Sequence, residues 1–69
     1  MKGYIMTISE FCSYGRFLAT LSDDVWIVRF TYDETGNTDI VFEVAEEWTN
    51  PDMMRQIMKN MATHYENVA

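Results

Sequence analysis

Two runs rich in β-branched and aromatic residues constrain this chain more than any other feature. Val25–Tyr32 and Asp39–Ala45 have the length and composition of β-strands, and residues 33–38 between them are turn formers. Two such runs joined by a short polar stretch form an antiparallel hairpin. The sequence therefore predicts a hairpin over residues 25–45.

The register of this hairpin can also be predicted, because side chains alternate between the two faces of a sheet. When paired residue numbers sum to 72, one face becomes wholly apolar and Arg29 lies opposite Glu43, which is a favourable pair. The apolar pairs are then Tyr32 with Ile40, Phe30 with Phe42, and Val28 with Val44. This register leaves the three-residue loop Thr35-Gly36-Asn37, in which Asn37 would take the left-handed conformation.

A helix is predicted after the hairpin, and its start is well marked. Asn50 is a good N-cap, Pro51 suits the first helical position and Asp52 complements the helix dipole. An apolar stripe then repeats at intervals of three and four residues. It consists of Met54, Ile57, Met58, Met61, Tyr65 and Val68.

The segment before the hairpin has two interpretations. Thr7 to Glu10 has the form of a capping box, and helical spacing follows, which favours a helix from Ile8 to about Thr20. Gly15 disfavours this helix, and it can instead mark close packing against a neighbour. The alternative makes Phe17–Leu21 a strand of a meander, with residues 22–24 as its turn.

The fold class that follows is α+β. A two-stranded hairpin is marginal alone, so its aromatic face needs a cover. We predict one domain over residues 1–69, a small two-layer α-β-β-α arrangement with the hairpin packed against N- and C-terminal helices. The segment Gly3–Met6 could add a short edge strand.

Length and charge limit the function classes. A chain of 69 residues with one cysteine has no internal disulfide, and chains this short often rely on a partner or a second copy. The net charge of −6 disfavours direct contact with nucleic acid or an anionic membrane and favours basic protein partners. We expect no signal peptide, no membrane span and a cytoplasmic location.

No constellation of residues predicts an enzyme. Cys12 and His64 are the one thiol and the one imidazole, and they fall on different predicted helices. We expect Cys12 to be packed and inert on the buried stripe of its helix, and His64 to be a surface residue. The loop from Asp33 to Asp39 has oxygen side chains at alternate positions, but it lacks the glycine and glutamate positions of a calcium loop. We expect no metal or cofactor.

The candidate site is therefore a partner-binding surface. An aromatic residue on a loop beside acidic groups is a plausible anchor, and exposed methionines suit adaptable contacts. The candidate residues are Asp33, Glu34, Asp39, Glu43, Glu46, Glu47, Trp48, Asp52 and Met53.

Two hypotheses use this surface in different ways. In the first, a non-enzymatic binder presents carboxylates to a basic groove that normally holds nucleic acid, and its size and charge resemble those of small phage-encoded inhibitors of host or defence proteins. In the second, a structural or regulatory homodimer forms through the methionine-rich helix or through the free edges of the hairpin.

Overall fold

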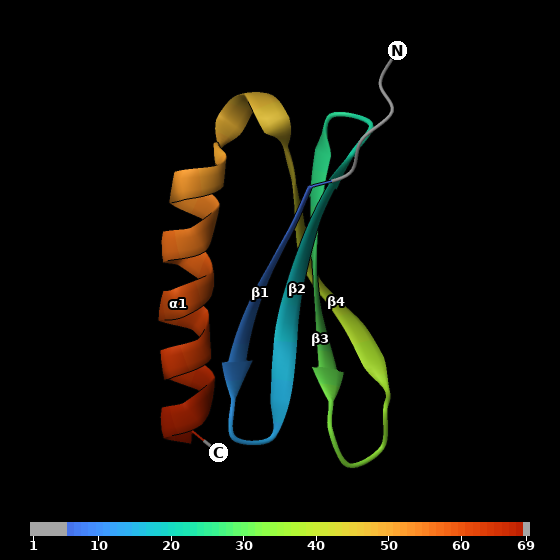
Figure 1. Ribbon diagram of the computed structural model, residues 1–69, viewed down its shortest axis with the longest axis vertical. Helices are drawn as coiled ribbons and strands as arrows, with labels where there is room; N and C mark the ends of the chain where they lie inside the picture. Colours follow the sequence, from blue (N-terminus) through green and yellow to red (C-terminus); the bar gives the residue numbers. More distant parts are fainter. Residues whose placement is uncertain (1–5, 69) are drawn as a thin grey trace.

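In the described part of the chain, four strands follow one another as an antiparallel meander, and one α-helix comes after them (Figure 1). The structure is a computed structural model that describes residues 6–68. Its elements are β1 (Met6–Cys12), β2 (Gly15–Ser22), β3 (Val25–Tyr32), β4 (Thr38–Ala45), the short 3-10 helix η1 (Glu46–Trp48) and α1 (Pro51–Val68). The strands lie in the order β1-β2-β3-β4. The α+β class is confirmed, but the two-layer α-β-β-α arrangement is not.

The predicted helix from Ile8 to Thr20 is wrong, because β1 and β2 occupy that segment. Buried and less buried residues alternate strictly along β2, so Phe17, Ala19 and Leu21 share one face. This alternation competes with the helical spacing of the same residues, and pairing of β2 with β3 decides between them.

The alternative interpretation, a strand and a turn, is confirmed. Asp23 and Asp24 form a two-residue loop and both have positive φ, 53° and 65°, as a type I′ hairpin turn requires. The predicted edge strand Gly3–Met6 lies outside the described residues except for Met6, with which β1 begins.

The hairpin of β3 and β4 is confirmed, but its predicted register is wrong. Val28 pairs with Phe42, and the register shifts between Val28 and Arg29, so that Arg29 pairs with Ile40 and Glu43 with Ile27. The cause lies in the turn. Residues 33–37 form the loop between the strands, five residues instead of the predicted three, and within it Gly36 takes the positive φ of 77°. The backbone N–H of Tyr32 donates to the Asn37 carbonyl at 2.9 Å at the base of this loop.

The core lies on the face of the sheet that α1 covers. The fully buried large side chains come from two strands, β2 and β3, and from the helix: Trp26, Phe17, Phe30, Met54, Met58 and Val28. Ile8, Ala19, Leu21 and Ala62 complete the buried cluster. Phe42 and Val44 keep the predicted inward face because their actual partners are shifted by an even number of residues.

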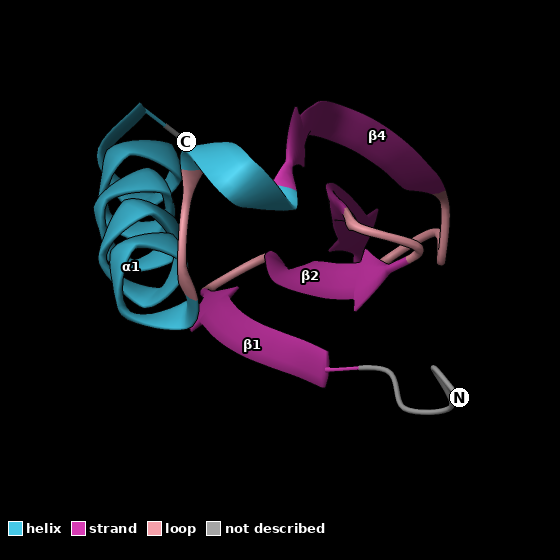
Figure 2. Cartoon of the chain, turned by 90° about the horizontal axis from the view of Figure 1, so that it is seen from above, coloured by secondary structure: helices cyan, strands magenta, loops and turns pink. Residues whose placement is uncertain are grey.

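The helix makes its main sheet contacts with β1 and β2, not with the β3–β4 hairpin that we expected it to cover (Figure 2). Tyr65 of α1 still reaches β3, since its ring centroid lies 4.7 Å from that of Phe17 and 5.0 Å from that of Phe30. The Tyr14 hydroxyl donates to the Tyr65 carbonyl at 3.1 Å. An aromatic cluster therefore ties the last turns of α1 to the turn between β1 and β2.

Candidate functional site

The turn between β2 and β3 meets η1 at one end of the molecule (Figure 1). Because Val25 pairs with Ala45, the residues next to this pair, Asp24 and Glu46, are brought side by side. The Glu46 backbone N–H donates to the Asp24 carbonyl at 2.9 Å. An open groove at this junction is lined by Asp24, Ala45, Glu46 and Glu47.

Trp48 is the most exposed large apolar side chain of the described residues, with 71% of its surface accessible. It ends η1, which is held by a hydrogen bond of 3.2 Å from the Thr49 backbone N–H to the Glu46 carbonyl. Thr49 itself is buried. A buried residue thus follows the exposed indole directly and fixes the backbone from which it projects.

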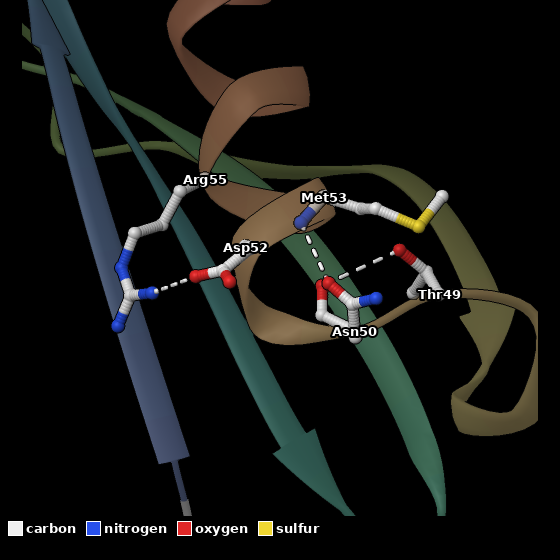
Figure 3. Close-up of polar contacts among 5 residues, drawn as sticks. All are labelled: Thr49, Asn50, Asp52, Met53 and Arg55. Atoms are coloured by element: carbon white, nitrogen blue, oxygen red, sulfur yellow. Dashed lines mark hydrogen bonds and ion pairs between the residues drawn. The ribbon is translucent and has the colours of Figure 1, made fainter.

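The start of α1 adds two further candidate residues (Figure 3). The Asn50 side-chain oxygen accepts from the Met53 backbone N–H at 2.9 Å, which confirms the predicted N-cap. Asp52 forms an ion pair of 3.1 Å with Arg55, and both side chains are largely exposed, so the pair contributes little to stability. Met53 is 48% exposed and its side chain lies on the side of Thr49.

We call this surface the acidic end. It consists of Asp23, Asp24, Glu46, Glu47, Asp52, Trp48 and Met53. Within residues 6–68 the Asp52–Arg55 contact is the single ion pair, so the other four carboxylates have no cationic partner there. The acidic end therefore combines an exposed indole with a strongly negative local potential.

The other predicted carboxylates lie elsewhere. Asp33 and Glu34 are exposed in the loop between β3 and β4, at the opposite end of the long axis of 40 Å (Figure 1). Asp39 and Glu43 are exposed on β4, an edge strand of the sheet, between the two ends. The structure thus brings together Glu46, Glu47, Trp48, Asp52 and Met53 and separates them from Asp33 and Glu34.

Asp23 and Asp24 were missing from the predicted site. They join it because β2 and β3 are consecutive strands whose turn lies beside the end of β4. The alternative interpretation of residues 17–24 contained the signal, since a turn at residues 22–24 must lie at the same end as the residues that follow Ala45.

The methionine stripe is mostly core. Met54 and Met58 have no accessible surface, and Met61 packs partly buried against the same cluster. The alternative hypothesis was a homodimer through the methionine-rich helix. Among the methionines of α1, Met53 is the one exposed for such a contact, because the stripe is largely buried.

At the opposite end of the molecule, the side chains of Glu66 and Tyr14 have shifted pKa values. The backbone N–H of Ser13 donates to the Glu66 carboxylate at 2.6 Å. Hydrogen bonding from Ser13, first from its side chain and then from its backbone, lowers the pKa of Glu66 below its ordinary value of 4.5. Burial, followed by the nearby Cys12, raises the pKa of Tyr14 above 10.0. Both groups hold α1 to the turn after β1, so they are structural.

Cys12 and His64 occupy separate environments. Cys12 lies on β1 and not on a helix, pairs with Gly15, and is a half-buried free thiol packed against the core. His64 is exposed on α1, as expected. In the described part of the chain, no three His, Cys, Asp or Glu side chains gather as a metal site requires, and this includes the loop from Asp33 to Asp39. The helices of residues 6–68 also include none with the length and apolarity of a membrane span.

Comparison with known proteins adds no relative. The chain matches no protein-family model, no curated protein and no solved structure.

Proposed function

We propose that this protein is a non-enzymatic binding protein whose acidic end docks onto a basic surface of a protein partner. The observation that carries the proposal is the 71% exposure of Trp48 at the acidic end, where Asp23, Asp24, Glu46 and Glu47 form no ion pair within residues 6–68. Tryptophan is among the residues that most often dominate binding energy, so an exposed indole beside acidic groups is a suitable anchor for a partner.

The physical roles divide between two kinds of side chain. Trp48 enters an apolar pocket of the partner, where burial of the indole gives most of the affinity. Asp23, Asp24, Glu46 and Glu47 lie at the same end of the molecule, steer the encounter and select a partner with lysine and arginine around that pocket. Met53, half exposed at the edge, adapts to the shape of the partner.

The finer form of the proposal concerns the partner's own ligand. A basic surface with an apolar pocket is typical of proteins that hold nucleic acid, so the acidic end would occupy that surface and exclude the nucleic acid. This is the behaviour of a small inhibitor of the kind that phages encode, acting in a reducing compartment such as the cytoplasm, where Cys12 stays a free thiol.

The test begins with affinity purification on the immobilised full chain at about 50 mM salt, where surface electrostatics are weakly screened. The variants are Trp48→Ala and the pair Glu46→Lys with Glu47→Lys. The matched control is Asp33→Lys with Glu34→Lys, which makes the same change of charge at the opposite end. We expect a partner that wild type and control retain and both test variants lose, with affinity about 30-fold lower for Trp48→Ala, as for a hot spot of ~2 kcal/mol.

Two further measurements on that partner test the mechanism. Binding should weaken strongly between about 50 mM and 500 mM salt, and the partner's nucleic acid should compete with this protein. Affinity that does not change with salt, or equal loss in the control variant, would contradict a role for the acidic end.

A further inference from the structure

Among residues 6–68, no element covers the second face of the sheet. Along β2 and β3 the residues that alternate with the core residues point away from α1. Phe11 and Ile40 on this face are 65% and 56% exposed, and Leu18, Val25 and Ile27 are half-buried by their neighbours in the sheet. We call this surface the open face.

The charges of the open face differ from those of the rest of the protein. By register it carries Arg16, Arg29 and Glu43, while the other carboxylates lie on turns, on α1, on η1 or on the opposite face. Two cations and one anion give it a small positive charge in a chain whose net charge is −6. Two copies of this chain therefore repel each other least when they meet through their open faces.

The pattern at the centre of the open face is self-complementary. Arg29 is paired with Ile40, and Glu43 is paired with Ile27, so a cation and an anion alternate with two isoleucines across β3 and β4. No ion pair joins Arg29 to Glu43 within residues 6–68. In a two-fold dimer, a residue i that contacts residue j of the second copy is matched by j contacting i. Arg29 of each copy would then meet Glu43 of the other, with the isoleucines packed between them.

We infer that the open face binds a second copy of this chain, forming a face-to-face dimer of sheets. The face is preferred to the free edge of β4 because that edge carries Asp39, Glu43 and a register irregularity, and charges and bulges discourage edge-to-edge pairing. The inference is independent of the acidic end, which stays exposed in such a dimer.

The size of the face limits the affinity. Four strands of seven or eight residues present roughly 500 Å² at about 4.8 Å between strands and 3.3 Å per residue. The dimer would bury roughly 1,000 Å² in total, which is near the lower limit for a specific interface. We therefore expect reversible association with a dissociation constant in the micromolar range or weaker.

Sedimentation equilibrium of the full chain from about 5 µM to 500 µM tests the inference. We expect the mean mass to rise from 8.1 kDa towards twice that value with concentration. Arg29→Glu or Glu43→Arg alone should weaken dimerisation at least tenfold, because each places like charges opposite each other, and the double exchange should restore it. The matched controls are Arg55→Glu and Glu46→Arg, which change the net charge equally on other surfaces.

Far-UV circular dichroism of every variant separates loss of dimer from loss of fold. The inference is overturned if wild type stays at 8.1 kDa at 500 µM, if the controls dissociate the dimer as strongly as the open-face variants, or if the folded double exchange remains monomeric.

Discussion

Gly15 leaves no room for a side chain, and substitution by alanine should be severe for so small a change. A Cβ at this position would contact the far edge of the Phe30 ring, with Cε2 at 2.6 Å, and the carbonyl oxygen of Thr31, also at 2.6 Å. Contacts this close require one of the two neighbours to move.

Neither neighbour can move freely. Phe30 is 1% exposed, and the centroids of Phe17, Tyr32 and Tyr65 lie within 5.0 Å of its own. The Thr31 carbonyl belongs to the backbone of β3. Overpacking of such a site costs about 3 kcal/mol, and the reduced flexibility of the unfolded chain offsets about 0.5–1 kcal/mol of it. We therefore expect Gly15→Ala to lower the free energy of unfolding by about 2 kcal/mol.

Urea titration followed by far-UV circular dichroism measures this loss. With a slope of about 1 kcal/mol per molar, the midpoint should fall by about 2 M. The same substitution in a Phe30→Leu background should cost only about 1 kcal/mol, because the clashing ring atoms are gone while the Thr31 carbonyl remains. Gly36→Ala is the matched control: its positive φ of 77° costs about 1–2 kcal/mol in either background, since nothing lies within 4 Å of its Cβ position. An unchanged midpoint for Gly15→Ala, or an equal cost in both backgrounds, would refute this account of the packing.

Three further changes probe the caps, the turn and one ionisation. Asn50→Ala should cost about 1 kcal/mol in the same urea assay, because it removes the N-cap of α1, and no loss would contradict the cap. Asp23→Asn with Asp24→Gly should raise the stability by about 1 kcal/mol, since asparagine and glycine suit positive φ better, and destabilisation would count against the turn type. The pKa of Glu66 is lower in the folded protein than its ordinary value of 4.5, so the hydrogen bond stabilises the fold above that pH and is lost as pH falls through the folded pKa. Acid titration should therefore destabilise wild type more steeply below about pH 4.5 than Glu66→Ala, and parallel curves would show that Glu66 does not contribute.

The second half of the fold could be predicted from the sequence because its signals are local. The two strands of the hairpin each carry their own composition, and Asn50 and Pro51 mark the helix start within two residues. Residues 8–20 lacked such a signal, because Ile8, Phe17 and Leu21 fit helical spacing and strand alternation at once. The pairing of β2 with β3 decides in favour of strands, and this pairing joins residues that are distant in sequence.

The candidate site also contains residues that are neighbours in sequence and residues that only strand pairing brings together. Glu46, Glu47 and Trp48 are close in sequence and remain together in the structure, so local reasoning found them. Asp23 and Asp24 join them through strand pairing, and the hairpin register failed because five residues, not three, form the loop after Tyr32.

The position of α1 over β1 and β2 has a consequence for the order of folding. The meander is built from neighbouring strands and can form through short loop closures, whereas the contacts of Tyr65 and Glu66 with Tyr14 and Ser13 span 51 and 53 residues. We expect the helix to dock late, on a sheet whose apolar inner face is already assembled. Until then Phe17 and Phe30 are open to water and to other chains, so the interval before docking is when this protein is most prone to aggregate.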